Sequence, residues 1–371
     1  MKTSAVAGII FANANENMLK QLTEQRSMAS VPFGSRYRLI DFSLSNLVNA
    51  GVSNVGIITK ENYRSLMDHV GNGAAWDLDR KNGGLHILPP YFTKGAKKYS
   101  GTLDALNGAM GFIERCKSEH IVICNAYMVA NVDIAAAVKA HKAKNADFTV
   151  IYHNDILPVQ MDGTMVIKTD ENERITEMNF ANGGEKANFG IGIIIVNRNL
   201  LIKLVKEAYD NDLESFAKDI IAAKLKTLNV YGFEHKGFVA VMDSTETYFK
   251  ANMALLQKSV REDIFNKERP VLTKTRDDMP TRYGTKSKVT NSLLGDGCIV
   301  EGTVKNSILF RGVKVEKGAV VENCILMQET VVSADTVLEN VISDKNAAIG
   351  TGMVLKGTPE NYFFIKKQQI V

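Results

Sequence analysis

Cysteine, tryptophan and long apolar runs are all scarce in this chain of 371 residues. The four cysteines, Cys116, Cys124, Cys298 and Cys324, form no C-x-x-C pair and lie far apart. Such sparse use argues against a disulfide framework or a zinc site, and it is typical of reduced thiols in the cytoplasm. No run approaches the roughly 18 apolar residues that a membrane span needs. We therefore expect a cytoplasmic protein with no membrane partner.

A strong excess of charge of one sign is also missing. Lys and Arg number 45 against 41 Asp and Glu, which gives a formal net charge of +4. A nucleic-acid-binding protein should show a clustered basic patch, and a disordered chain should be poor in apolar residues, whereas 45% of these residues are hydrophobic. We expect a globular protein of two or three domains with no nucleic-acid partner.

The first apolar stretch, residues 5–11, has two interpretations. It follows Lys2 and precedes Ala12-Asn13-Ala14, so it resembles the apolar region and A-x-A cleavage site of a secretory signal. It is short for such a region, however, and it is also typical of a buried central strand of a parallel sheet. We favour the strand and keep the signal as the alternative.

Up to about residue 260, short strand-like runs alternate with helix-like spacing of apolar residues. The pattern recurs in residues 55–58, 102–113, 120–124, 148–152, 191–196, 200–209 and 248–260. Alternation of this kind predicts an α/β, Rossmann-like domain with a mostly parallel sheet over residues 1–260. Residues 261–285 carry Pro270, Pro280 and many charges, and we expect them to form a linker.

After residue 285 one short pattern recurs. Its copies begin at Val289, Val304, Val321 and Leu338, which are 15, 17 and 17 residues apart, and Asn takes the third place in each. An aliphatic residue about every six positions, three to a repeat, predicts a left-handed parallel β-helix of hexapeptide repeats over residues 286–371. About four coils should stack to bury a continuous core. Ordinary antiparallel hairpins, the alternative, would not require this regular spacing.

Three further segments are distinctive. Pro32 to Asn46 reads P-F-G-S-R-Y-R-L-I-D-F-S-L-S-N, Ser100 to Ala105 reads S-G-T-L-D-A, and Tyr248 to Asn252 reads Y-F-K-A-N. Together with the first strand and the repeats, they closely resemble the bacterial glucose-1-phosphate adenylyltransferases over essentially the whole chain. Those enzymes join glucose 1-phosphate to ATP and release pyrophosphate and ADP-glucose for glycogen synthesis. The resemblance implies that the α/β domain is a nucleotidyltransferase domain.

The nucleotide loop departs from the family's pattern. The family follows its first strand with G-G-x-G-T-R, whose glycines let backbone amides approach the phosphates and whose arginine neutralises developing charge. Here the stretch is Asn13-Ala14-Asn15-Glu16-Asn17-Met18, so the glycines are missing and Met18 stands in place of the arginine. In the family's R-A-K-P motif, Arg26 remains and Met28 replaces the lysine. We interpret Asn13, Ala14, Asn15 and Glu16, with Gly101 and Thr102, as a vestigial nucleotide loop.

The two acids that hold Mg²⁺ in the family are also replaced. The family's G-D-H turn reads Asn125-Ala126-Tyr127 here, so Ala126 replaces the first acid, and alignment on Tyr248 puts Val241 in place of the second. Asp243 lies two residues further on. An extended strand would place its side chain on the same face as Val241, so it stays a weak candidate for a metal ligand. We expect no metal and no cofactor bound by this chain.

Losses of this kind remove most of a nucleotidyl transfer site. The transfer depends on positioning and on metal and cationic stabilisation, and removing one such group typically lowers the rate on the order of 10²–10³-fold. The pattern, together with residues 69–90, resembles the non-catalytic subunits of the family, the GlgD glycogen biosynthesis proteins. This resemblance implies a regulatory, catalytically impaired chain. It would join the Mg²⁺-using catalytic subunit in a hetero-oligomer, specifically a heterotetramer, and raise its activity.

Two other functions were weighed against this one. The chain would be an active adenylyltransferase if displaced ligands such as Asp243 rebuilt the metal site. The β-helix would be an acyltransferase module only if it supplied a general base, and no histidine follows residue 285. We therefore set the acyltransferase aside and keep the active enzyme as the alternative.

Three arginines remain around the Phe33-Gly34 turn: Arg26, Arg36 and Arg38. The family binds anionic effectors near equivalent basic residues, and guanidinium groups hold phosphate through bidentate contacts. We predict that these arginines bind a phosphorylated effector. The alternative is that one or two of them pair with Asp41 or another carboxylate.

Overall fold

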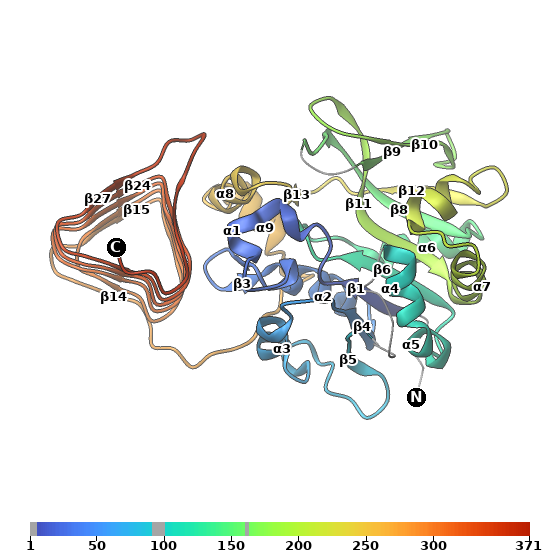
Figure 1. Cartoon of the computed structure of the whole chain (residues 1–371), viewed down its shortest axis with the longest axis horizontal. Coiled ribbons are helices and arrows are strands. Elements are labelled where there is room, and N and C mark those ends of the chain that lie inside the picture. Colours follow the sequence, from blue (N-terminus) through green and yellow to red (C-terminus); the bar gives the residue numbers. More distant parts are fainter. Residues whose placement is uncertain (1–5, 91–100, 160–162) are drawn as a thin grey trace.

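The computed structural model describes residues 6–90, 101–159 and 163–371. They form an α/β domain followed by a β-helix of triangular cross-section (Figure 1). The predicted fold class is therefore confirmed. The first apolar stretch forms β1 (Val6–Phe11), a central strand of the main sheet, as the strand interpretation requires.

The nine-stranded sheet of the α/β domain is parallel around β1 and mixed beyond it. β1 lies between β4 (Asn54–Ile58) and β6 (His120–Asn125), and β5 (Gly84–Leu88) pairs with β4; all three pairings are parallel. On the other side, β11 (Lys186–Asn197) is antiparallel to both β6 and β8 (Phe148–Ile156). The remaining strands are β12 (Val230–Glu234), parallel to β8, and the antiparallel pair β9 (Thr164–Thr169) and β10 (Ile175–Ala181) beside β11.

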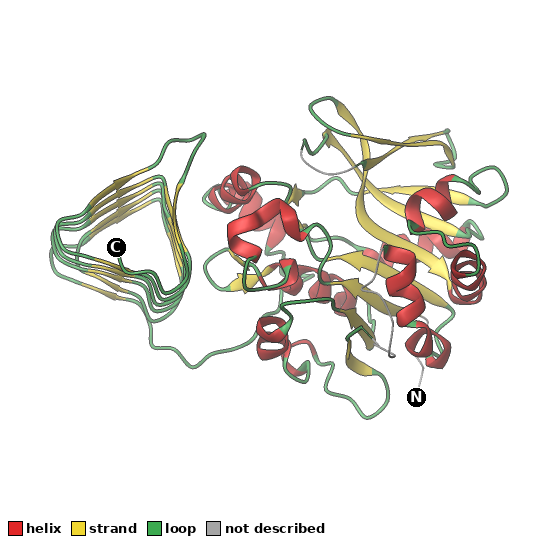
Figure 2. Ribbon diagram, in the orientation of Figure 1, coloured by secondary structure: helices red, strands yellow, loops and turns green. Residues whose placement is uncertain are grey.

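Side chains of β1 alternate between two apolar cores, one on each face of the sheet. Val6 and Ile10 belong to the first core, and Ala7, Ile9 and Phe11 to the second, as the two-residue period of a strand requires. The first core also includes residues of α2 (Leu39–Asn49), α6 (Ile134–Ala143) and α8 (Thr245–Ala254). The second includes residues of α4 (Thr102–Gly108), α5 (Met110–Arg115) and α7 (Arg198–Tyr209) (Figure 2).

The remaining helices are short and lie at the edges of the α/β domain. They are α1 (Lys20–Thr23), α3 (Arg64–Val70) and α9 (Lys258–Ile264), with 3-10 turns at Glu16–Leu19, Met28–Ser30 and Ala74–Trp76 and a π-helical turn at Phe216–Ala222. The helical spacing over residues 248–260 thus corresponds to two helices, α8 and α9. No helix in the described ranges is both long and apolar enough to cross a bilayer.

The β-helix consists of three parallel five-stranded sheets, ordered β14-β17-β20-β23-β26, β15-β18-β21-β24-β27 and β16-β19-β22-β25-β28. Five strands in each sheet make five coils instead of the four expected: the four recognised copies lie in the first four coils, and β26, β27 and β28 form the fifth. The first coil begins at Arg282, inside the expected linker. The irregular connection between the two domains therefore spans residues 265–281, between α9 and β14. The strands are β14 (Arg282–Tyr283), β15 (Lys288–Thr290), β16 (Leu293–Leu294), β17 (Ile299–Val300), β18 (Thr303–Lys305), β19 (Ile308–Leu309), β20 (Lys314–Val315), β21 (Val320–Glu322), β22 (Ile325–Leu326), β23 (Val331–Val332), β24 (Val337–Glu339), β25 (Val341–Ser343), β26 (Ala348–Ile349), β27 (Val354–Lys356) and β28 (Phe363–Ile365).

The two domains share an apolar core along one side of the β-helix. Ile308, Ile325 and Ile342 belong to the first core of the α/β domain, whereas their neighbours Leu309 and Leu326 point into the β-helix. The alternation of side chains along each short strand produces this division. The sheet that contains β19, β22 and β25 therefore faces the α/β domain and forms one wall of the cleft between the domains.

Candidate functional site

The positions that lose catalytic groups are filled by apolar side chains in the first core. Met28 is 0%, Ala126 1% and Val241 8% exposed, and the half-buried Met18 packs against the same core. The amide of Ala126 donates to the carbonyl of Phe11 at the end of β1. These residues thus lie at the carboxyl edge of the parallel strands, where α/β sheets bind their ligands. Apolar side chains there supply neither a metal ligand nor a charge for phosphate.

The two positions that hold acids in the family do come together. β13 (Ala240–Val241) pairs antiparallel with β7 (Met128–Val129), which brings Val241 beside the turn at residues 125–127. Asn125, Tyr127 and Val241 line one cavity of about 140 Å³, and the Asn125 amide donates to the Tyr127 hydroxyl at 3.2 Å. Val241 therefore lies beside the turn that contains Ala126, and neither position carries a carboxylate.

Asp243 does not replace them. β13 ends at Val241, and the amide of Asp243 donates to the carbonyl of Val241 at 3.0 Å, so the chain turns where we expected it to stay extended. The two carboxylate oxygens accept from the Thr247 hydroxyl at 2.5 Å and the Val159 amide at 2.9 Å. No cluster of three His, Cys, Asp or Glu residues suited to a metal occurs in the part of the chain that the structure describes. The residues present do not fit Mg²⁺.

The loop after β1 is closed by its own side chains. The side-chain amide of Asn13 donates to the Glu16 carboxyl at 2.6 Å and to the Glu61 carbonyl at 2.9 Å. Its side-chain oxygen accepts from the backbone amide of Lys60 at 2.7 Å. Asn15 has a φ of 57°, and a 3-10 turn follows it instead of an open glycine loop. Burial raises the pKa of Glu16 to about 7, against the opposing effect of the Asn13 hydrogen bond. When ionised, this carboxyl would repel a phosphate.

Gly101 and Thr102 contact a different segment, residues 214–216. A Cβ atom on Gly101 would lie 2.3 Å from the Glu214 carbonyl, so packing alone requires a glycine there. The Thr102 hydroxyl accepts from the Phe216 amide at 2.9 Å. The predicted vestigial loop is therefore two segments with separate packing partners, one near residues 60–61 and one near residues 214–216.

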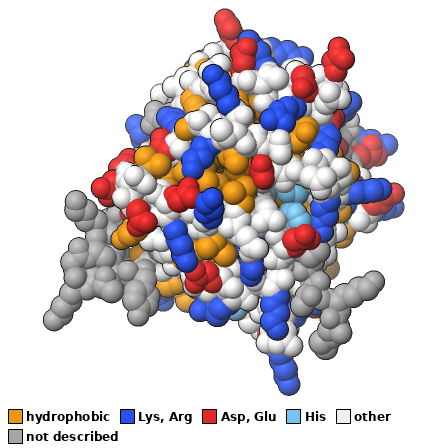
Figure 3. Space-filling view, turned by 90° about the vertical axis from the view of Figure 1, so that its right-hand side faces the viewer, with side chains coloured by type: hydrophobic (Ala, Val, Ile, Leu, Met, Phe, Trp, Pro, Cys, Tyr) orange, Lys and Arg blue, Asp and Glu red, His pale blue; other side chains and the backbone are white. Residues whose placement is uncertain are grey.

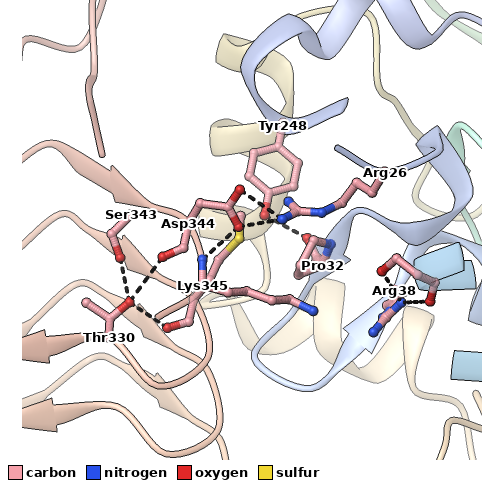
Figure 4. A network of polar contacts seen from close by, with 10 residues as sticks. Arg26, Pro32, Arg38, Tyr248, Thr330, Ser343, Asp344 and Lys345 are labelled. Carbon is pink, nitrogen blue, oxygen red and sulfur yellow. Dashed lines mark hydrogen bonds and ion pairs between the residues drawn. The ribbon is translucent and has the colours of Figure 1, made fainter. Parts of the chain in front are cut away.

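Arg26 makes a buried ion pair that links the two domains (Figure 4). Its Nη2 atom lies 2.7 and 2.9 Å from the two carboxylate oxygens of Asp344, and the two side chains are only 3% and 5% exposed. On the β-helix side, the hydroxyl groups of Thr330 and Ser343 lie 2.8 Å apart behind this pair. Arg26 thus pairs with a carboxylate, although not with Asp41.

Arg36 and Arg38 line a cleft of about 250 Å³ between the α/β domain and the β-helix. Arg36 forms an exposed ion pair with Asp296 at 3.1 Å, and Arg38 donates to the carbonyl and hydroxyl of Ser65. Of the three arginines, these two face the cleft together, and Arg26 lies behind its wall. Four further cations line the cleft with them, two from the segment after α9 and two from the β-helix: Lys274, Arg276, Arg311 and Lys345.

The positive charge of this cleft is only partly compensated. Asp68 is the one carboxylate among its described lining residues. Lys345 points toward Arg38 (Figure 4), and burial together with repulsion by Arg38 and Arg26 lowers the pKa of Lys345 to about 6. Arg311 is 3% exposed, and its Nε atom lies 3.8 Å from carboxylate oxygens of Asp278 and Asp296, too far for a hydrogen bond, so within the described ranges it has an ionic but no hydrogen-bond partner. An anion in the cleft would relieve this repulsion and satisfy buried donors.

A different arrangement of charge covers the end of the α/β domain remote from the β-helix. On that face lysines and arginines are interspersed with acids, and apolar side chains are scattered among them (Figure 3). Interspersed charges of both signs are typical of a solvated surface. The concentration of positive charge is thus a property of the cleft and not of this face.

Neither the four additional basic residues nor the acid that pairs with Arg26 could be predicted from local motifs. A signal for Asp344 was present in the repeats, because the strand register makes it equivalent to Phe310 and Met327 of the preceding coils. A carboxylate in a column of buried apolar residues requires a partner from another element. Lys274 and Arg276 gave no comparable signal, since they lie in an irregular, highly charged segment.

Comparison with known proteins finds a matching family for each of the two domains. Residues 7–258 match the nucleotidyl transferase family, and residues 278–361 match a family described as GlmU-like, C-terminal hexapeptide. The glycogen biosynthesis protein GlgD of Bacillus subtilis (strain 168) is 35% identical over 367 residues, 99% of this chain and 97% of the relative. GlgD of Geobacillus stearothermophilus is 37% identical over 361 residues, 97% of this chain and 95% of the relative.

A named enzyme matches over a similar span. Glucose-1-phosphate adenylyltransferase of Geobacillus stearothermophilus is 31% identical over 330 residues, 87% of this chain and 84% of the relative. The matches therefore include both a protein named for glycogen biosynthesis and a protein named for the transfer reaction. The chain belongs to the glucose-1-phosphate adenylyltransferase family of nucleotidyl transferases, together with the GlgD glycogen biosynthesis proteins.

Proposed function

We propose that this chain is a regulatory, catalytically impaired subunit that associates with the catalytic subunit of glucose-1-phosphate adenylyltransferase and activates it. The observation that carries the proposal is the packing of Met28, Ala126 and Val241 into an apolar core where the reaction would need a cation and two carboxylates. Nucleotidyl transfer depends on those charges. ADP-glucose formation for glycogen biosynthesis, and the Mg²⁺ it uses, would therefore belong to the partner.

The proposed complex is a heterotetramer in the cytoplasm. The GlgD and adenylyltransferase relatives match this chain over at least 87% of its length, so partner and chain would share both domains. Subunits that share a fold can associate through equivalent surfaces, as related chains in symmetric assemblies do. A mixed complex of this kind needs no additional binding module.

The interdomain cleft would let such a subunit respond to a phosphorylated effector. Six cations face it, and a phosphate bound there would contact Arg36 and Arg38 on one side and Arg311 and Lys345 on the other. Because these residues come from both domains, binding would bias the position of one domain against the other. Arg26 would shape this site through Asp344 and would not contact the effector.

The test measures ADP-glucose synthesis by a purified catalytic subunit at increasing amounts of this chain. We expect negligible turnover by this chain alone, a rise in the rate of the mixture, and a mixed tetramer in light scattering after size exclusion. A mixed complex with an unchanged rate at every ratio would contradict activation. The absence of any complex would contradict the partner.

Asp243 supplies the control for the alternative, an active enzyme. Substantial turnover by the pure chain that is lost in Asp243→Asn would show that this carboxylate still takes part in transfer. Asp219→Asn is the matched variant, because the Asp219 carboxylate also accepts two hydrogen bonds, both from backbone amides, beside a helical turn that is separate from β13. Equal activity in both variants would leave Asp243 a purely structural role.

A further inference from the structure

A second cavity, of about 480 Å³, lies between α8 and one corner of the β-helix. Its volume is in the range of pockets that bind small molecules. Among the described residues that line it, none is charged, which separates it from the basic cleft. The lining residues are Phe249, Met253, Leu256 and Gln257 on the α8 side, and Asn291, Asn306, Asn323, Asn340, Pro359 and Tyr362 on the β-helix side.

The four asparagines form a row along one wall of this groove. Each follows the last residue of a strand in a single sheet, β15, β18, β21 or β24, so successive asparagines lie one coil apart, about 4.8 Å. Their φ values lie between 42° and 54°. Asn tolerates this left-handed conformation better than most residues. This backbone preference alone explains why Asn occupies the corner, and it does not involve the side-chain amide.

The amides of this row are only partly paired. Asn291 donates to the side chain of Asn306 at 2.8 Å, and Asn340 donates to the carbonyl of Gly357 at 3.2 Å. The backbone amide of Asn323 donates to the carbonyl of Lys305, whereas its side-chain amide has no hydrogen-bond partner in the ranges that the structure describes. The wall therefore offers donors and acceptors, spaced along the β-helix axis, to a molecule in the groove.

The α8 side of the groove is apolar and aromatic, and an insertion in the last coil of the β-helix reaches across to it. A single residue connects β24 to β25, whereas residues 357–362 connect β27 to β28. This longer loop reaches toward α8 (Figure 1), where the ring of Tyr362 stacks on Phe249 with centroids 4.0 Å apart and planes 20° apart. Met253 and Leu256 extend the apolar surface.

We propose that this groove binds a neutral carbohydrate chain. Sugar hydroxyl groups both donate and accept hydrogen bonds, as carboxamides do, so a row of amides matches them at each step. The apolar face of a pyranose ring packs against aromatic and aliphatic side chains on the other wall. Because the described lining carries no charge, it offers nothing to neutralise a phosphate or a carboxylate. An extended peptide fits less well, because the groove presents side-chain amides and not an open strand edge.

The experiment titrates the full chain with maltoheptaose and, separately, with cellohexaose by calorimetry. These probes distinguish α-linked from β-linked glucose chains, and we expect one of them to bind. In the double variant Asn306→Gly, Asn323→Gly, glycine keeps the left-handed backbone but removes two amides, so the affinity should fall roughly tenfold or more. Tyr362→Leu should weaken binding similarly, and Tyr362→Phe should not.

Asn346→Gly is the matched control. Asn346 also has a left-handed backbone, with a φ of 58°, but lies at another corner of the β-helix outside the groove. Its substitution should leave carbohydrate affinity unchanged. The proposal is overturned if neither probe binds at millimolar concentration, or if the groove and control variants lose affinity equally. A third outcome also overturns it: the wild type binds no carbohydrate, and the groove variants no longer bind the catalytic subunit. The groove would then be a protein interface. None of these outcomes depends on whether the chain activates a partner.

Discussion

The remnant of the transfer site and the basic cleft have opposite electrostatic character, although the short segment from Met18 to Arg38 contributes to both. At the remnant, Met28, Ala126 and Val241 have become part of an apolar core. In the cleft, six basic side chains converge from the α/β domain, the segment after α9 and the β-helix. The comparison teaches that one scaffold can fill one site with apolar side chains while it concentrates charge suited to binding in another.

Asp344 should give the largest effect, because it neutralises a cation behind the cleft. Asp344→Asn would leave Arg26 buried without a counter-charge beside Lys345, and breaking a buried pair in this way costs about 3–5 kcal/mol. Urea unfolding measures the loss. The double variant Arg26→Met, Asp344→Leu removes both charges and should recover most of the stability. A double variant as unstable as the single one would show that the ion pair is not the cause.

Anion binding in the cleft should depend on pH through Lys345. Its folded pKa of about 6 lies below its usual value, so it is mostly neutral at pH 8, and a bound anion favours the charged form. Sulfate keeps its charge over this range, and its affinity should rise as the pH falls from 8 to 6, by up to about tenfold per unit. Calorimetry in Lys345→Met should show a weaker dependence, and the exposed Lys317→Met should behave as the wild type. A pH-independent wild type would contradict the prediction.

Glu16 should make the remnant of the transfer site sensitive to pH. Its folded pKa of about 7 exceeds its ordinary value of 4.5, so its stabilising contribution is complete below pH 4.5 and is lost as the pH rises through 7. Because the side chain is partly exposed, solvent screening should limit the effect to about 1 kcal/mol. Glu16→Gln mimics the protonated form, and its stability relative to the wild type should increase with pH. The exposed Glu171→Gln should show no such trend; if it did, the trend would not report on Glu16.

The exposed pair between Arg36 and Asp296 should give the smallest effect on stability. Both side chains are 40% exposed, and such pairs are worth about 0–1 kcal/mol. Arg36→Gln should therefore change the free energy of unfolding by less than about 0.5 kcal/mol. It should nevertheless weaken sulfate binding, because Arg36 lines the cleft. A loss of stability as large as that of Asp344→Asn would remove the distinction between the buried and the exposed arginine.

Periodicity predicted the fold well, because aliphatic spacing reports burial directly. The copies at Val289, Val304, Val321 and Leu338 are paired with one another in the β-helix, as their spacing implies. The fifth coil was not counted because its segment Leu355-Lys356-Gly357 has glycine where the four copies have asparagine. The start at Arg282 was missed because both residues of β14, Arg282 and Tyr283, are exposed and give no aliphatic signal.

The site was predictable only where local motifs fix it. Ala126 could be assigned because it follows the strand-like run at residues 120–124, and Val241 because it lies a fixed distance before the Tyr248–Asn252 motif. The partner of Arg26 could not, since Asp344 lies 318 residues further along the chain and only the packing of the two domains joins them. Asp243 was misplaced because β13 has only two residues and the chain turns directly after it.

The column of Ile308, Ile325 and Ile342 on the outer face of the β-helix has a consequence for folding. These side chains are completely buried against the α/β domain, so neither domain can open without exposing apolar surface of the other. Heating should therefore melt the whole chain in a single cooperative transition. A β-helix cut away from residues 1–264 would expose this isoleucine column together with Phe310 and Met327, and it should aggregate instead of folding as an independent unit.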